Sequence, residues 1–274
     1  MRDEARARAR LGSEVHLVPA TAEALEACVP TVRAVVNLAG APIFTRWTDA
    51  ARERIVSSRL DTTRSIVRAM ELADTPPAVL VSASAIGWYD ASVPEVQDER
   101  APAAGGFVGE LVREWEHTAS EAEASGVRVV LARIGLVVGP GGGMLGNMLP
   151  AFRAGLGGRI GSGRQAMPWV HLDDVVEVLV QALTDARYAG PINLVAPDPE
   201  RTQQSFAEAL GGVLGRPTVV PAPAFAIRLV MGDAAELLLV SPRVAPRRLE
   251  ALGYTFRYRS LVPALEAATR PRPR

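Results

Sequence analysis

Short apolar runs alternate with longer amphipathic stretches along most of this chain, and this alternation constrains the fold more than any other feature. Runs typical of buried strands lie at 34–38 (AVVNL), 78–82 (AVLVS) and 127–132 (VRVVLA). Helix-like stretches separate them at 48–73 and 107–125. Strand, helix and strand in this succession form right-handed crossovers and a parallel sheet. The sequence therefore predicts an α/β fold in which these three strands are neighbours.

The same alternation continues on both sides of these strands. Further elements are predicted at 14–19 (strand, EVHLVP), 21–28 (helix capped by Thr21), 145–152 (helix), 169–172 (strand), 175–183 (helix capped by Asp173) and 192–195 (strand). Beyond Pro197, prolines interrupt three or four short predicted helices. We therefore predict a Rossmann-like domain over 1–197 and a small helical domain over 198–270.

Charge and cysteine content exclude several classes of protein. Lys plus Arg and Asp plus Glu are 30 each, so no net field attracts nucleic acid or an anionic membrane, and small molecules are the expected partners. The single cysteine, Cys28, makes no internal disulfide, and the three histidines lack metal-ligand spacing. The histidine spacing therefore predicts no metal site. We expect a cytoplasmic protein, since no apolar run reaches the roughly 20 residues that span a bilayer and no signal peptide is recognisable.

Five stretches that occur in one order carry a family resemblance. They are VVNLAGAPI (35–43), SASAIGWYD (82–90), FVGELVREWE (107–116), RIGLVVGPGGGML (133–145) and WVHLDD (169–174). Together they resemble the extended, atypical short-chain dehydrogenase/reductase superfamily, whose members are NAD-dependent epimerase/dehydratase-like. Within it, the chain is most similar to the YfcH-like branch, which has a small extra C-terminal domain that residues 241–258 resemble.

The resemblance implies a doubly wound parallel sheet that binds NAD or NADP. In the family, a strand, a Gly-rich turn and a helix come first and hold the cofactor pyrophosphate. With the AVVNLAG stretch aligned, residues 14–19 correspond to the third strand, so we expect the first two strands and the Gly-rich turn to be absent. A misplaced start or a shortened chain explains this, and a natural deletion is the alternative. Either way, NAD(P) binding by this chain alone is expected to be weak.

The resemblance also assigns cofactor contacts. They are Asn37, Leu38, Ala39 and Gly40 as a wall beside the dinucleotide, with Arg59, Ser82, Gly139 and Gly141 around it. Glycine at the end of a strand is also ordinary turn chemistry. Arg59 either meets a phosphate or is a solvated helix arginine.

Ser84 matches the catalytic serine of the superfamily, which hydrogen-bonds the substrate oxygen; the alternative is a loop serine that caps the backbone. The family's base is a tyrosine with a lysine four residues later, the lysine lowering the pKa of the phenol. Alignment on Trp115 and Glu116 places Val108 and Val112 at those positions. Because the chain contains no lysine at all, the classical pair is predicted to be missing.

Tyr89 is a candidate substitute acid/base, with Arg59 or Arg133 as its cation, or else it packs with its apolar neighbours. Gln165 and Trp169 lie in a segment that contacts the sugar nucleotide in epimerase relatives, so the resemblance implies a substrate role for them. The first hypothesis is therefore an NAD(P)-dependent epimerase or reductase acting on a nucleotide sugar or similar molecule. A non-catalytic dinucleotide or metabolite sensor, or an inactive fragment, is the alternative.

Overall fold

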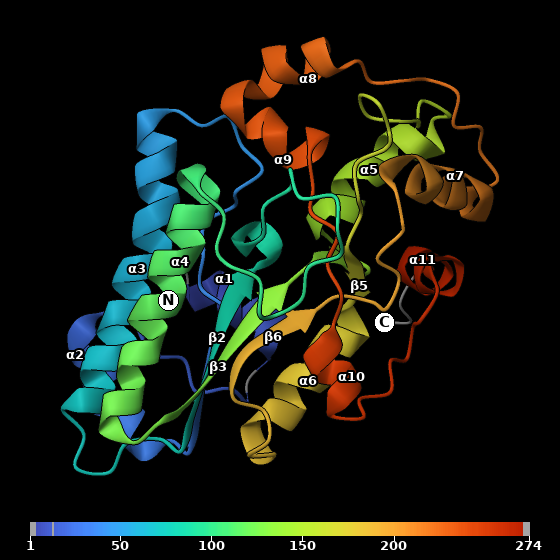
Figure 1. The fold of residues 1–274 in the computed structure, drawn as a ribbon. Coiled ribbons are helices and arrows are strands. Elements are labelled where there is room, and N and C mark those ends of the chain that lie inside the picture. Colours follow the sequence, from blue (N-terminus) through green and yellow to red (C-terminus); the bar gives the residue numbers. More distant parts are fainter. Residues whose placement is uncertain (1–3, 13, 271–274) are drawn as a thin grey trace.

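A parallel sheet of four strands forms the centre of the protein in the computed structural model, which describes residues 4–12 and 14–270 (Figure 1). The strands lie in the order β1 (Ala34–Asn37), β2 (Val79–Ala85), β3 (Arg128–Ile134) and β6 (Gly190–Leu194). All three of the predicted central strands are neighbours and parallel. The predicted α/β class is thereby confirmed.

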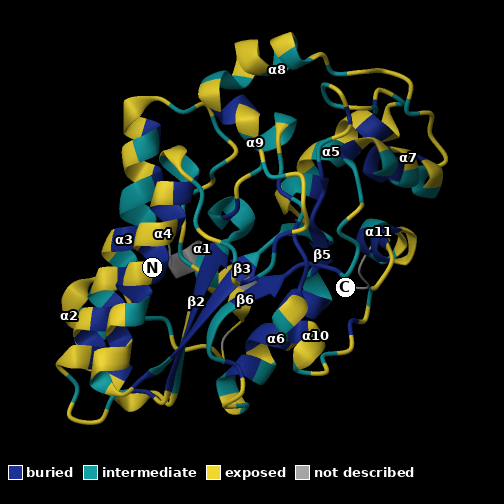
Figure 2. Ribbon diagram, viewed as in Figure 1, coloured by how far each residue is buried: buried dark blue, intermediate teal, exposed yellow. Residues whose placement is uncertain are grey.

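Helices cover both faces of the sheet, and alternate side chains of each strand face them. Leu80 and Val129 pack toward α2 (Ala22–Cys28) and α3 (Asp49–Glu71), with α4 (Gly106–Ser120) beside them. Val81 and Val130 face α6 (Leu172–Thr184) and α10 (Arg247–Ala251) on the other side. Figure 2 shows the sheet as the most buried layer, between helices whose outer faces are exposed. Burial of both faces explains why the strands are continuous apolar runs.

The register of β2 and β3 places polar side chains together at one end of the sheet. Ser82 pairs with Leu131, and two residues further Ser84 pairs with Arg133. Since the strands are parallel, their carboxyl ends meet at the same edge, where ligands bind in folds of this type. The edge strand β1 leaves Val36 and Leu38 on the surface, 42% and 57% exposed.

Two sequence-based expectations about elements were wrong, and one strand was missed. Residues 14–19 form no strand, because this short run ends at a proline and pairs with no described strand. The helix α6 begins at Leu172, and His171 rather than Asp173 is its N-cap: its Nδ1 accepts a hydrogen bond from the Asp173 N–H at 3.1 Å. Strand β4 (Leu136–Val138) was missed, because glycines flank it; it pairs with β5 (Trp169–His171).

Helices dominate the chain after β6. They are α7 (Gln203–Leu214), α8 (Ala224–Met231), α9 (Glu236–Leu239), α10 and α11 (Leu261–Thr269), five α-helices in the described residues where three or four were expected. The remaining helices are α1 (Glu4–Leu11) near the start and α5 (Gly143–Arg153) after β4. Buried Asp174 of α6 accepts hydrogen bonds from the backbone N–H groups of Arg257 and Tyr258, which fixes the C-terminal segment to the sheet domain. None of the described helices is both long and apolar enough to cross a membrane.

Candidate active site

Ser84, at the carboxyl end of β2, is hydrogen-bonded to a buried carboxylate. Its Oγ donates to Oε1 of Glu116 at 2.5 Å, and the serine is only 4% exposed. Glu116 comes from α4, which packs on this end of β2. The hydroxyl hydrogen of Ser84 is therefore committed to Glu116, and the serine is not among the residues that line the two cavities described below.

Arg133 of β3 holds the same carboxylate with two parallel hydrogen bonds. Its Nε lies 2.8 Å from Oε1 of Glu116 and its Nη2 lies 2.8 Å from Oε2, and both side chains are buried. Burial by itself lowers the pKa of Arg133, but the hydrogen bonds and negative charge of Glu116 outweigh burial, and the net shift is upward. The guanidinium also lies 3.9 Å from the ring centre of Trp88, a cation–π contact.

Tyr89 extends this network to β6. Its hydroxyl accepts a hydrogen bond from Nη1 of Arg133 at 3.0 Å and donates one to Oδ1 of Asn193 at 2.6 Å. Burial raises the pKa of Tyr89 to about 12, although the charge of Arg133 opposes the shift. At neutral pH the phenol keeps its proton, and its hydroxyl is engaged both as an acceptor, from Arg133, and as a donor, to Asn193.

Sequence reasoning named Ser84, Tyr89 and Arg133 but missed the parts played by Glu116 and Asn193. A usable signal was present, because Asn193 interrupts an apolar run of a buried strand and Glu116 lies on the face of α4 that carries buried Val112 and Ala119. Buried polar side chains require partners, so such interruptions in neighbouring elements indicate a shared network.

The two positions aligned with the family's tyrosine and lysine are part of the packing of α4. Val108 contacts Gly87, where an added Cβ would lie 2.4 Å from Cγ1 of the valine. Val112 is 3% exposed. Neither side chain moves a proton, and the chain holds no lysine to replace them.

The residues assigned to the cofactor wall lie at the carboxyl end of the edge strand. Asn37 is buried, where its amide donates to Oγ1 of Thr63 and its Oδ1 accepts the N–H of Ala39. Leu38 and Gly40 are exposed. The result is an exposed apolar shelf with a backbone turn held firmly beneath it, which suits a flat ligand.

Arg59 underlies the same turn. Its guanidinium donates to the carbonyl oxygens of Ile55 and Ala41, and an added Cβ at Gly40 would lie 3.1 Å from its Cζ. Burial lowers the pKa of Arg59. These contacts hold the 39–41 turn in place, and no ion pair of Arg59 is seen among the described residues.

The other assigned residues are spread more widely. Ser82 is fully buried in the middle of β2, and Gly139 is packed against Leu172, whereas Gly141 is exposed with φ +86°. A side chain at Gly141 would meet open space but would be strained by this backbone angle.

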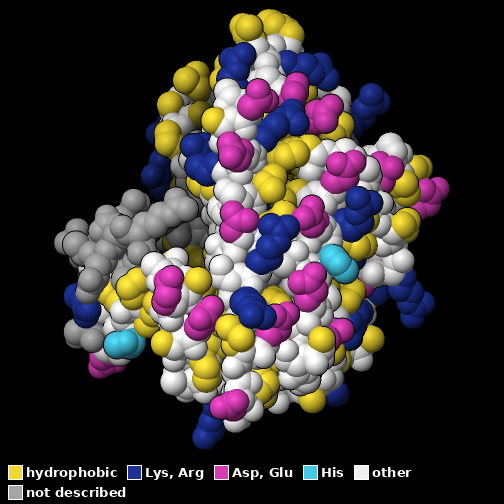
Figure 3. All heavy atoms as spheres, turned by 90° about the vertical axis from the view of Figure 1, so that its left-hand side faces the viewer, with side chains coloured by type: hydrophobic (Ala, Val, Ile, Leu, Met, Phe, Trp, Pro, Cys, Tyr) yellow, Lys and Arg dark blue, Asp and Glu magenta, His cyan; other side chains and the backbone are white. Residues whose placement is uncertain are grey.

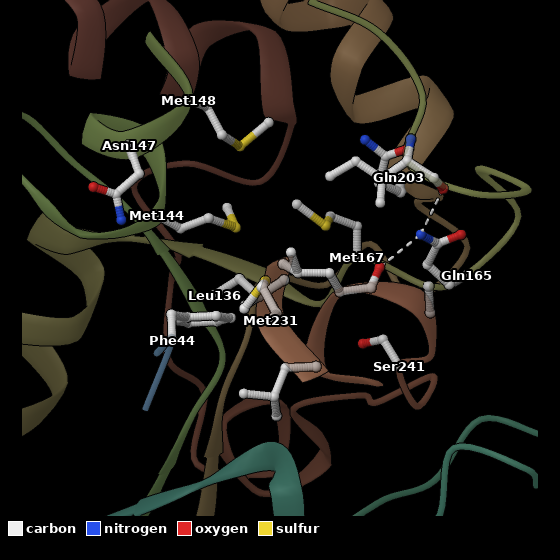
Figure 4. Close-up of a pocket in the computed structure, with 14 residues that line it drawn as sticks. Phe44, Leu136, Met144, Asn147, Met148, Gln165, Met167, Gln203, Met231 and Ser241 are labelled. Carbon is white, nitrogen blue, oxygen red and sulfur yellow. Dashed lines mark hydrogen bonds between the residues drawn. The ribbon is translucent and has the colours of Figure 1, made fainter. Parts of the chain in front are cut away.

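Two cavities lie beyond the carboxyl edge of the sheet. Gly87, Tyr89 and Val108 line one of about 630 Å³. The other, of about 270 Å³, includes Gln165 and is drawn in Figure 4. Leu237 lines both cavities, so the two cavities are neighbours that share this residue.

Trp169 lines neither of these cavities. It is 1% exposed, packs in a core between β5 and α7, and donates its indole N–H to Asp198 at 3.2 Å. No group of three or more His, Cys, Asp and Glu side chains suited to a metal ion occurs in residues 4–12 and 14–270.

The fold and the site are those of a dinucleotide-fold protein of the short-chain dehydrogenase/reductase class. They comprise a parallel sheet with helices on both faces, a serine at the carboxyl edge of the sheet and an added helical part. The model of the NAD dependent epimerase/dehydratase family matches residues 3–194, more than half of the chain, and a domain of unknown function matches residues 222–268. The chain belongs to this epimerase family, and the predicted superfamily is confirmed.

Known proteins resemble this chain in sequence and in structure along most of its length. The chloroplastic epimerase family protein SDR39U1 homolog of Arabidopsis thaliana is 42% identical over 88% of this chain and 69% of its own length. Human epimerase family protein SDR39U1, crystallised with NADPH, superposes with a TM-score of 0.87 at 36% identity, over 96% and 93% of the two chains. A nucleoside-diphosphate sugar epimerase from Corynebacterium glutamicum superposes with a TM-score of 0.71 at 28% identity, over 89% of this chain and 48% of its own.

Proposed function

We propose that this protein is an NAD(P)-dependent oxidoreductase that acts on a carbonyl or hydroxyl group of a small molecule without a Tyr/Lys pair. The observation that carries this proposal is the position of Ser84 at the carboxyl edge of the central strand, bonded to buried Glu116, which Arg133 also binds. We further propose that the protein acts in the cytoplasm and that its two parts divide near residue 197.

The exposed shelf of Leu38, Ala39 and Gly40 would hold one face of the cofactor. Its apolar surface and the close backbone turn fit a ribose or an adenine ring. The NADPH in the crystal structure of the human relative supports NADPH as the cofactor here. When bound, the cofactor supplies or accepts a hydride at its nicotinamide ring.

Ser84 would orient the substrate oxygen. Because its hydrogen points to Glu116, its oxygen accepts a hydrogen bond from a substrate hydroxyl, which favours the direction of alcohol oxidation. Arg133 binds both oxygens of Glu116 and thereby fixes the acceptor to which the serine hydroxyl points. We propose a positioning role for Tyr89, in place of the proton carrier suggested by sequence, because its hydroxyl is occupied by Arg133 and Asn193.

The sensor hypothesis is kept as a second candidate for one reason. The resemblance implies that Val108 and Val112 take the places of the family's proton-transfer groups, and general acid/base groups contribute about 10² to 10⁴-fold to a rate. A protein that binds NADPH tightly and turns over no substrate would fit that hypothesis.

Single-turnover reduction of NADP⁺, followed by the absorbance of the NADPH formed, tests the oxidoreductase proposal with a panel of neutral alcohols and of nucleotide sugars. We expect turnover with at least one alcohol, and a loss of about 10²-fold in Ser84→Ala. The exposed Ser65→Ala, which loses only a bond to the Asp61 carbonyl, is the matched control and keeps the wild-type rate. Tight NADPH binding without turnover on any compound would instead favour the sensor.

A further inference from the structure

Methionines surround the smaller of the two cavities. Met144 and Met148 of α5, Met167 and Met231 of α8 line it, four of the six methionines in the chain. Figure 4 shows their thioethers pointing into a common space. Thioether side chains are apolar, polarisable and adaptable in shape, so they suit apolar ligands of varied outline.

None of the described residues that line this cavity is charged. Its few polar groups are Asn147, Gln165, Gln203 and Ser241. The amides of Gln165 and Gln203 are used mainly to bind backbone groups of the 158–160 loop and Leu238. Buried Oε1 of Gln165 has no hydrogen-bond partner among the described residues, and Ser241 presents its hydroxyl at the cavity edge (Figure 4). The cavity therefore offers apolar contact with one or two hydrogen bonds.

The lining and charge of the two cavities disfavour a nucleotide sugar. The smaller cavity has no charged side chain among its described lining residues and so offers no cation to a diphosphate. In the larger cavity, Arg52 is already paired with Asp233 at 2.7 Å, and Asp90 and Glu236 add negative charge. A diphosphate would meet repulsion there and no arginine that is unpaired.

We propose that the methionine-lined cavity binds the apolar part of the substrate, and that the substrate is an uncharged, mainly apolar carbonyl compound or alcohol rather than a nucleotide sugar. This inference rests on the proposed oxidoreductase function. Leu237 separates the cavity from the one lined by Tyr89 and Gly87, so a substrate held here can direct its polar end toward the carboxyl edge of the sheet.

Fluorescence of the neutral dye N-phenyl-1-naphthylamine tests the cavity directly in the full chain. We expect saturable binding that a medium-chain ketone such as 2-nonanone displaces and that UDP-glucose does not displace. Met148→Glu places a carboxylate at the wall and should weaken dye binding at least tenfold. Leu229→Glu, a change of the same kind on the exposed side of α8, is the control and should leave the affinity within twofold.

Met231→Trp is a second variant that fills the cavity without adding charge, and it should also abolish dye binding. The inference is overturned if the dye does not bind, if both variants bind it as wild type does, or if UDP-glucose displaces it as well as the ketone. Calorimetry with NADPH separates the two proposals. Dye binding without NADPH binding would contradict the oxidoreductase proposal and support the apolar binding site. NADPH binding without dye binding would contradict the apolar binding site and leave the oxidoreductase proposal standing.

Discussion

Arg133 and Glu116 form a buried, two-pronged ion pair between β3 and α4, directly beside Ser84. Both partners are almost fully enclosed, with side-chain exposures of 2% and 6%. A pair of this kind contributes little net stability, but removing one partner leaves the other as an uncompensated buried charge. The pair thus explains the direction in which the Ser84 hydroxyl points.

Arg133→Met should lower the free energy of unfolding by about 3–5 kcal/mol, because Glu116 is then buried without its cation. Urea denaturation measures this difference. Arg68→Met is the matched control, since it breaks the exposed pair with Glu71 and should cost less than about 1 kcal/mol. Equal costs for the two variants would show that the buried pair has no special role.

Tyr89 should make stability depend on pH in the alkaline range. Its pKa is raised from 10.0 to about 12 on folding, so the native state retains a proton that the unfolded state loses. The resulting stabilisation is complete below pH 10 and is lost as the pH rises to about 12, at about 1.4 kcal/mol per pKa unit, or about 2–3 kcal/mol. Unfolding curves at several pH values measure it. In Tyr89→Phe this part of the alkaline loss should disappear, and an unchanged slope would contradict the assignment.

Installing the family's lysine should fail at Val112. This position is 3% exposed, and both oxygens of Glu116, one helical turn away, are already bound by Arg133. We expect Val112→Lys to destabilise the protein by several kcal/mol in thermal or urea unfolding. Val176→Lys, on the 51% exposed face of α6, should change stability by less than about 0.5 kcal/mol. A stable Val112→Lys protein would mean that the site accommodates the classical chemistry after all.

The sequence was sufficient for the sheet, because β2 and β3 are buried on both faces and read as continuous apolar runs. It was insufficient for β4, whose three residues stand between glycines. It also misjudged residues 14–19, where an apolar run has no partner strand. Strand formation depends on pairing, which a local pattern does not contain.

The candidate site was only partly accessible from sequence. Ser84 and Arg133 were predicted as site residues because they occur in family motifs. The pairing register of β2 and β3 places them side by side. Glu116 and Asn193 were missed, since their partners lie 17 or more residues away along the chain. The methionines of the smaller cavity come from separate segments, so only the fold brings them together.

Calorimetric titration of the protein with NADPH tests the central claim most directly. We expect weak but saturable binding by the wild-type chain, and Leu38→Asp should weaken it by a further 10 to 100-fold or so (about 1–3 kcal/mol), because the change removes apolar contact and places a negative charge beside the cofactor. Val176→Asp, at a similarly exposed apolar residue on α6, should bind NADPH as the wild type does. Absence of NADPH binding by the wild type, or equal affinity in Leu38→Asp, would contradict the proposed cofactor site at the edge of the sheet.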